Sequence, residues 1–174
     1  AALIIALAFV AIPVGAAGVP IVLQNAAVIL AGLILGRTRG FLTALLFLSL
    51  GLIGLPVLAG GKTTLAALGG PTVGYLVGYL ISATVAGSIA YLAPRGNRKA
   101  LTIYLALGAI AALACQYLCG SVGMMFRADM SFGQALAVNV PFLIPDLIKA
   151  ACVVAIASGV HLSLPDIRRK AFLK

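Results

Sequence analysis

Residues 100–126 read ALTIYLALGAIAALACQYLCGSVGMMF and carry no charged side chain. About 20 apolar residues in a helix are enough to cross the hydrocarbon core of a bilayer. This stretch therefore predicts a membrane-spanning helix. Apolar runs on either side, bounded by charges, proline and glycine, predict five more such helices, at about 1–13, 20–36, 40–54, 71–93 and 145–164.

The composition indicates the same class of protein. Of the 174 residues, 63% are hydrophobic and 9% are charged, and the mean hydropathy is +1.21. A soluble domain carries about 25% charged residues, so this chain has too few to cover a globular surface. We predict an all-α, polytopic membrane protein with six transmembrane helices in a single bundle, forming one domain over residues 1–174. Because residue 1 already lies in an apolar run, we expect the native N-terminus further upstream.

The start of the last helix is set by a proline. The run 131–164 is too long for one crossing, and proline is well tolerated in the first turn of a helix. We therefore begin the last helix at Pro145. The segment 131–142 is then expected to form a short helix or loop near the outer surface.

The charges predict how the chain is oriented. There are twelve Lys and Arg side chains against three acidic ones, and they lie in short clusters between the apolar runs without interleaved aromatic residues. This pattern is typical of the positive-inside rule rather than of nucleic-acid binding. With six helices, one side carries Lys62, Arg127 and Asp129, and the other carries Arg37, Arg39, Arg95, Arg98, Lys99, Arg168, Arg169, Lys170 and Lys174. We therefore expect a multi-pass protein of the cytoplasmic membrane with both termini in the cytoplasm.

The sequence GGKTT at 60–64 resembles the end of a nucleotide-binding P-loop. That motif needs a glycine five residues before the second one, and this position is Pro56. Proline has no N–H to donate to a phosphate. The predicted orientation also places the loop outside the cell, so we do not expect a nucleotide site.

Two ionisable residues lie inside the last apolar run, Asp146 and Lys149 in PDLIK. A charge in the bilayer core costs about 3 kcal/mol on insertion scales and is by default a functional candidate. Their i, i+3 spacing places them on one helix face, and a start at Pro145 places Asp146 in the first turn, where the helix dipole favours an anion. The pair predicts a polar ligand site in the outer half of the bundle; the alternative is a purely structural ion pair.

Other polar residues are expected at the same level of the membrane. They are Gln24, Asn25, Lys62, Thr63, Thr64, Thr72, Tyr75 and Asn139. The Gly70, Gly74, Gly78 spacing in the same region is typical of close helix packing, which we favour for Gly74 and Gly78.

The sequence gives no reason to expect an enzyme, a metal site or a cofactor. The chain contains no Glu and a single His, His161, near the predicted cytoplasmic end. We expect His161 to be a helix-end residue. Cys115 and Cys119 share a helix face, but no His or carboxylate is near enough in sequence to complete a metal site, so small packing residues are expected.

Four segments together resemble one transporter family. They are VPIVLQNAAVILAGLILGRTRG (19–40), GLIGLPVLAGG (51–61), GGPTVGYLVGY (69–79) and PDLIK (145–149). In this order and spacing the chain resembles the BioY family, the biotin-specific S component of energy-coupling-factor (ECF) transporters. The resemblance covers nearly the whole chain. Val73, Lys62-Thr63-Thr64 and Ile144-Pro145 depart from the family pattern and bear mainly on the loop contacts.

The resemblance implies six transmembrane helices and no ATPase within the chain. It implies biotin capture from outside, beneath a loop between the third and fourth helices, and energising by a membrane coupling subunit and two ATPase subunits. It places ligand contacts at Gly60, Gly61, Tyr75, Asp146 and Lys149.

The chemistry of biotin fits the same pair. Asp146 can accept a ureido N–H and Lys149 can donate to the ureido carbonyl. We expect Lys62, Thr63 and loop N–H groups to bind the carboxylate.

The small residues Ala2 and Ala6 lie one turn apart in the first predicted helix. In the family such a face packs against the coupling subunit, whereas packing inside the bundle is the alternative.

Three other functions are alternatives to biotin binding. An S component for thiamin should offer aromatic stacking and more acids, and riboflavin is a further vitamin candidate. A membrane enzyme would need a second carboxylate or a metal cluster. A structural subunit would bind no small ligand.

Overall fold

The computed structural model describes residues 1–12, 21–164 and 167. The described chain is helical apart from a pair of two-residue antiparallel strands, in which Ala11 pairs with Val22. In chain order the elements are α1 (Ala2–Ala8), β1 (Ala11–Ile12), β2 (Ile21–Val22), α2 (Gln24–Leu52), η1 (Ala59–Gly61), α3 (Thr64–Leu68), α4 (Val73–Ala90), α5 (Arg98–Ala128), α6 (Phe132–Ala137) and α7 (Val140–Ser163).

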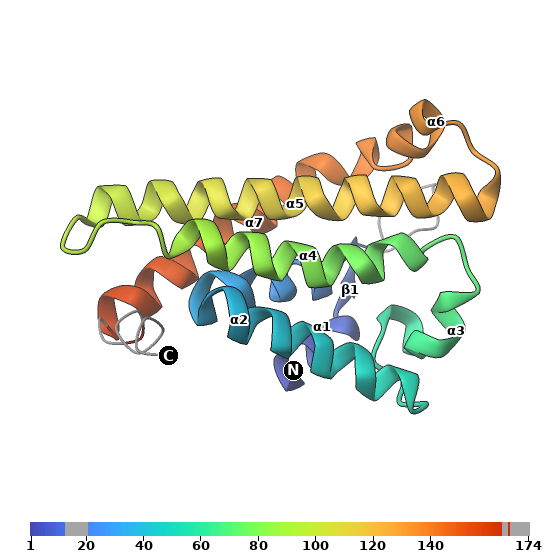
Figure 1. Cartoon of the computed structure of the whole chain (residues 1–174), viewed down its shortest axis with the longest axis horizontal. Coiled ribbons are helices and arrows are strands. Elements are labelled where there is room, and N and C mark those ends of the chain that lie inside the picture. The colour runs from blue at the N-terminus through green and yellow to red at the C-terminus, as the bar shows by residue number, and fades with distance from the viewer. Residues whose placement is uncertain (13–20, 165–166, 168–174) are drawn as a thin grey trace.

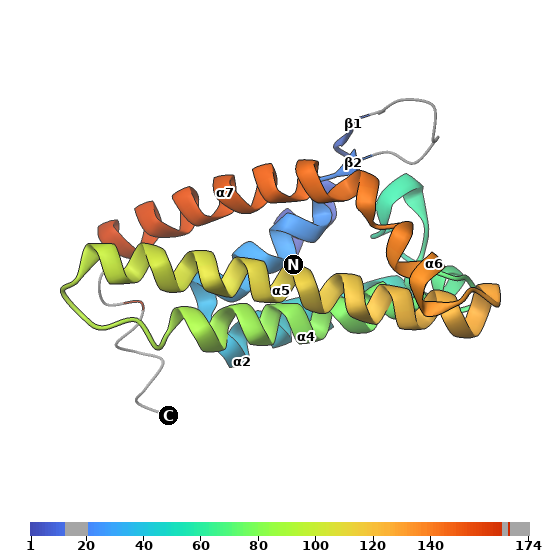
Figure 2. The same cartoon turned by 90° about the horizontal axis from the view of Figure 1, so that it is seen from above.

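The long helices lie along the longest axis of the molecule (Figure 1). The connection from α4 to α5 and the C-terminal end of α7 lie at one end, and α3 and α6 lie at the other (Figures 1 and 2). Within the described residues four helices, α2, α4, α5 and α7, are long and apolar enough to cross a membrane. The predicted all-helical membrane class is confirmed, while the count of six spans is not.

Helices α4 and α5 approach closely because glycines face each other between them. A Cβ added at Gly74 would lie 2.0 Å from the carbonyl oxygen of Cys119, and one added at Gly78 would lie 3.1 Å from the Cα of Gln116. Only residues without a side chain allow backbones so near. The packing role predicted for Gly74 and Gly78 is confirmed.

The two helices expected at 20–36 and 40–54 are joined in α2 without a loop. The backbone is non-helical at Gly36, with φ 81° and ψ 179°, a region open essentially to glycine alone. A Cβ at Gly40 would lie 2.8 Å from the Cα of Gly32, whereas eight residues of straight helix span about 12 Å. The chain therefore reverses at Gly36 and α2 forms two legs.

Side chains from two other helices bind the carbonyls that precede this break. Tyr91, just after α4, donates its hydroxyl to the carbonyl of Ile34 at 2.6 Å. His161 in α7 lies 2.9 Å, through Nε2, from the carbonyl of Leu33, and because a carbonyl only accepts, Nε2 carries the proton. The two rings also meet edge to face, with centroids 5.9 Å apart. His161 does lie in the last turn of α7, as expected, but it is buried and caps the first leg of α2.

Several predicted boundaries were wrong. The first helix ends at Ala8 instead of continuing to residue 13, which lies outside the described residues. The last helix begins at Val140 rather than at Pro145, because Pro141 occupies its first turn and Pro145 is accommodated inside it. The expected short helix near 131–142 is α6, with Ser131 and Gln134 forming a capping box.

The glycine-rich connection after α2 contains two short helical segments. Gly60 and Gly61 have φ of 73° and 71°, which glycine adopts without a steric penalty. The hydroxyl of Thr63 accepts a hydrogen bond from the N–H of Ala66 at 3.0 Å and so caps α3. The P-loop resemblance at 60–64 therefore reflects a tight turn followed by a helix N-cap.

Candidate functional site

The predicted charged pair lies at the centre of a buried polar cluster. Asp146 and Lys149 form an ion pair through Oδ1 and Nζ, which confirms that they share a helix face. Their side chains are 5% and 11% exposed. The hydroxyl of Tyr117 in α5 donates to Oδ2 of Asp146 at 2.6 Å. Because α7 begins at Val140, Asp146 lies in its second turn, so the prediction of a first-turn dipole contact was wrong.

Asn25, in the first turn of α2, connects both charges. Its Nδ2 donates to Oδ1 of Asp146 at 3.1 Å, and its Oδ1 accepts from Nζ of Lys149 at 2.9 Å. Lys149 also donates to the carbonyl of Val22 at 2.9 Å. An ammonium has three N–H donors, and the ion pair, Asn25 and Val22 use all three. The charges of Asp146 and Lys149 therefore neutralise each other within the cluster.

A second polar group lies between α4, α5, α6 and α7. The hydroxyl of Tyr75 donates to Oδ1 of Asn139 at 2.5 Å. Nδ2 of Asn139 donates to the hydroxyl of Ser121 at 3.0 Å and to the carbonyl of Ala135 at 3.1 Å. Asn139 is 4% exposed. The predicted site residues Tyr75 and Asn139 therefore bind each other and fix the junction of α6 with α7.

The remaining predicted residues are Gln24, the first residue of α2, and those of the loop after α2. Gln24 is 1% exposed, and its Nε2 donates to the carbonyl of Val57 at 2.7 Å. This bond ties the loop to the start of α2, next to Asn25. Lys62 is exposed, and its carbonyl accepts from the N–H of Leu58 at 2.9 Å. Gly60 and Gly61 form the turn between Leu58 and Lys62.

Sequence reasoning missed three members of these clusters. Tyr117 binds Asp146, and Ser121 binds Asn139. Gln116 is 1% exposed and donates through Nε2 to the carbonyl of Asn25 at 3.4 Å and to the hydroxyl of Ser82 at 3.0 Å. All three lie within residues 100–126, the run whose hydrophobicity predicts a membrane-spanning helix. Polar side chains inside a membrane helix face protein partners or water-filled cavities, so the sequence 116-QYLCGS-121 contained a usable signal.

The structure has an open pocket away from both polar clusters. A cavity of about 290 Å³ lies beside the α4–α5 connection and the end of α7. None of the predicted ligand residues lines it. Among the described residues no group of three or more His, Cys, Asp or Glu side chains could hold a metal ion. The predicted ligand residues Asp146 and Lys149 instead lie in the buried cluster, where protein groups bind one another.

Comparisons with known proteins agree over most of the chain. The sequence model of the BioY family matches residues 1–166. The chain is 42% identical over 160 residues to the biotin transporter BioY of Rhodobacter capsulatus, covering 86% of this chain and 82% of that protein. It is 36% identical over 157 residues to the biotin transporter BioY of Thermotoga maritima, covering 90% and 88% of the two chains.

A solved structure is also similar. The crystal structure of the S-component for biotin from an ECF-type ABC transporter superposes with a TM-score of 0.78 at 32% identity, covering 92% of this chain and 85% of that one. The range matched by the family model, residues 1–166, includes both polar clusters and the loop between α2 and α4. This chain belongs to the BioY family.

Proposed function

We propose that this chain is the substrate-binding membrane subunit for biotin uptake. The observation that carries the proposal is the way in which Asn25 is bound. Its carboxamide donates an N–H to Asp146 and accepts a hydrogen bond from Lys149. A ureido group presents the same neighbouring N–H donor and carbonyl acceptor. The buried pair is therefore built to bind one edge of a urea.

Biotin binding at this cluster follows from an exchange of partners. Asp146 and Lys149 are fully engaged with protein groups, so a ligand must replace some of them. The ureido edge of biotin replaces the carboxamide of Asn25 without leaving either charge unpaired. An exchange of equivalent hydrogen bonds avoids the cost of an unsatisfied buried polar group.

The carboxylate of biotin is assigned to the loop between α2 and α4. Lys62 supplies a cation on an exposed side chain, and the hydroxyl of Thr63 keeps its proton available for donation while its oxygen caps α3. Loop N–H groups beside Gly60 and Gly61 add further donors. Gln24 holds this loop next to the residue that contacts the charged pair.

A Lys62→Ala variant tests the carboxylate assignment. Because a surface charge pair contributes about 1 kcal/mol or less, we expect about a fivefold loss of affinity for biotin and almost no loss for a neutral biotin amide. The measurement is equilibrium binding of both ligands to purified protein, with Arg127→Ala as a control for charge. Unchanged preference for biotin over the amide would contradict the assignment.

We also propose six membrane crossings within a single domain over residues 1–174. They are a first crossing to which α1 contributes, the two legs of α2, and α4, α5 and α7; α2 supplies two of them because the chain reverses at Gly36. Arg37 follows that reversal, where α2 packs on Gly87 near the end of α4. Arg98 begins α5 at the same end of the molecule. Arg127 lies in the last turn of α5, at the opposite end (Figure 1).

By the positive-inside rule, this distribution favours a cytoplasmic location for the end of the molecule that carries Arg37 and Arg98, and for both termini. The protein is then inserted in the cytoplasmic membrane with the loop that contains Lys62 outside. A C-terminal tag that protease reaches in intact cells would contradict this orientation.

The partners proposed are the ECF coupling subunit in the membrane and its ATPase subunits. Ala2 and Ala6 are exposed on α1, whereas Ile4 and Ala8 face the bundle. This exposure supports a partner face rather than packing within the bundle.

A paired Ala2→Leu, Ala6→Leu variant tests that face. We expect at least about a tenfold loss of co-purified coupling subunit, since bulky residues prevent close helix approach, with biotin binding unchanged. Exposed Leu42→Ala, Leu46→Ala serves as the control. Undiminished co-purification would contradict the face.

The family assignment confirms a transport protein rather than an enzyme, and a structural subunit without a ligand is not favoured. Labelled biotin binding to the purified protein, with unlabelled thiamin and riboflavin as competitors, tests the substrate. Displacement by either vitamin at concentrations similar to biotin would overturn the proposal.

A further inference from the structure

One side chain of the Asp146 cluster, Asn25, binds both members of the charged pair. It donates to Asp146 at 3.1 Å and accepts from Lys149 at 2.9 Å. Within the described residues no other side chain bonds to both: the hydroxyl of Tyr117 contacts Asp146 at 2.6 Å, and Lys149 otherwise donates to the backbone carbonyl of Val22. Movement of Asn25 therefore frees an acceptor on Asp146 and a donor on Lys149 at the same time.

The backbone of Asn25 is held in place while its side chain has room to move. Gln116 in α5 donates to the carbonyl of Asn25 at 3.4 Å. The preceding residue, Gln24, is buried and bound to the carbonyl of Val57, and the following residue, Ala26, is buried in the core. Asn25 itself is half-buried. A rotation between staggered positions about its Cα–Cβ bond is enough to move the carboxamide away from the pair.

The charges stay paired when the carboxamide leaves. Asp146 keeps its bonds to Lys149 and Tyr117, and Lys149 keeps its bonds to Asp146 and Val22. A ureido ligand then offers an N–H and a carbonyl to the two atoms that Asn25 has left. Because the side chain and the ligand present the same groups to the same partners, one excludes the other. The apparent affinity for the ligand falls with the fraction of molecules whose site is open.

We propose that Asn25 is an internal competitor for biotin, whose carboxamide occupies the ureido position in the empty protein. This inference rests on the proposed function and deepens it by stating how the same site is regulated. In the empty protein the carboxamide gives both buried charges a partner. Its return after biotin leaves restores two hydrogen bonds to charged groups, which favours release of the vitamin into the cell.

An Asn25→Ala variant gives a result opposite in sign to that of a ligand contact. It removes the carboxamide and keeps Asp146 and Lys149. We expect the purified variant to bind labelled biotin about tenfold more tightly than the unmodified protein, the equivalent of one hydrogen bond to a charged group. Equal or weaker binding would overturn the proposal. Asn25→Ser removes the carboxamide with a smaller loss of polarity, and tighter binding is expected of it too if the alanine variant does not fold.

Thermal unfolding separates competition from a purely structural role. Without ligand, Asn25→Ala should unfold at a lower temperature than the unmodified protein, because the bonds to the pair are lost. With saturating biotin the two should unfold at similar temperatures, because the carboxamide no longer contributes in either. An equal loss with and without biotin would show that Asn25 only supports the fold.

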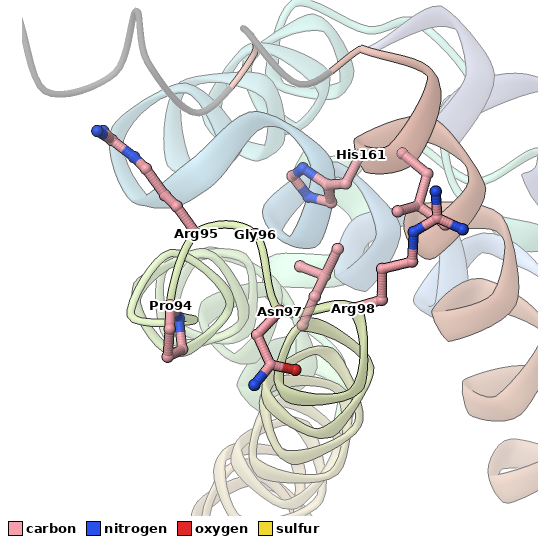
Figure 3. A pocket seen from close by; sticks show the side chains of 8 residues that line it. Pro94, Arg95, Gly96, Asn97, Arg98 and His161 are labelled. Atoms are coloured by element: carbon pink, nitrogen blue, oxygen red, sulfur yellow. The ribbon is translucent and has the colours of Figure 1, made fainter.

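Asn97→Ala is the matched control for the loss of a carboxamide. Asn97 caps α5 by accepting from the N–H of Ala100 at 3.0 Å. It lines the open cavity shown in Figure 3, and no residue of the Asp146 cluster lines that cavity. We expect this variant to lose stability equally with and without biotin and to keep normal biotin affinity. A gain in affinity here as well would remove the specific role of Asn25.

A second probe, 2-imidazolidone, separates this inference from the proposed function. This cyclic urea has the ureido edge of biotin without its thioether ring or carboxylate. Protection of Asn25→Ala by 2-imidazolidone, without protection of either protein by biotin, would overturn the proposed function and support the competition. Biotin binding to the unmodified protein without a gain in Asn25→Ala would overturn the competition alone. Failure of both compounds to protect either protein would overturn both proposals.

Discussion

Replacing Asp146 by asparagine is expected to weaken biotin binding by at least about 30-fold, since truncating one member of a buried charge pair costs about 2 kcal/mol or more. The carboxylate accepts from Lys149, Asn25 and Tyr117. An amide offers one acceptor oxygen and places an N–H where Asn25 or Tyr117 also donates. The measurement is equilibrium binding of labelled biotin to the purified variant.

Asp129→Asn is the matched control. Asp129 is exposed, follows α5 in the left-handed region with φ 49°, and asparagine is well suited to that conformation. The same change in charge at this site should leave biotin binding unchanged.

A second variant separates binding from folding. Asp146→Asn leaves Lys149 as a buried, unpaired cation, which costs about 3–5 kcal/mol of stability. Asp146→Asn, Lys149→Gln removes both charges and should recover much of the thermal stability while still failing to bind biotin. Normal affinity in this double variant would show that the pair is a structural ion pair only, which the sequence alone left open.

Gly74→Ala is expected to destabilise the protein by about 3 kcal/mol, the upper part of the range for overpacking. The new methyl group would lie 2.0 Å from the carbonyl oxygen of Cys119 and 2.9 Å from the Cα of Gly123. Both are backbone atoms, so relief requires α4 and α5 to separate along their contact. Thermal unfolding in detergent measures the loss.

The chain offers a control for the same substitution in another helix. Gly159 lies in α7, and a Cβ built there meets no atom within 4 Å. Gly159→Ala removes backbone freedom from the unfolded chain and should raise stability by up to about 1 kcal/mol. Similar unfolding temperatures for the two variants would contradict the close-packing explanation.

Hydrophobic run length predicted α4 and α5 well, because length and apolarity alone decide whether a helix suits a bilayer. The i, i+3 spacing likewise predicted the contact between Asp146 and Lys149, which is local to one helix. Such features depend on residues within a few turns of each other, so the sequence is enough.

The features that were missed depend on distant residues. The charges of Arg37 and Arg39 predicted a helix end at residue 36, but not that the chain reverses without a loop at Gly36. Its break is stabilised by Tyr91 and His161, which lie far along the chain. Pro145 does not start the last helix, because Pro141 occupies its first turn. The partners of Asp146 on α2 and α5 likewise follow from packing, which a single sequence does not report.

The hydrogen bonds from Tyr91 and His161 have a consequence for biogenesis. The carbonyls of Leu33 and Ile34 lie just before a helix break, and a carbonyl without a partner is costly in hydrocarbon. One donor comes from the end of α4 and the other from the last turn of α7. The first leg of α2 therefore reaches its final bonded state only after the ribosome has delivered α7. Insertion of the early helices and completion of their hydrogen bonding are separate events in the synthesis of this protein.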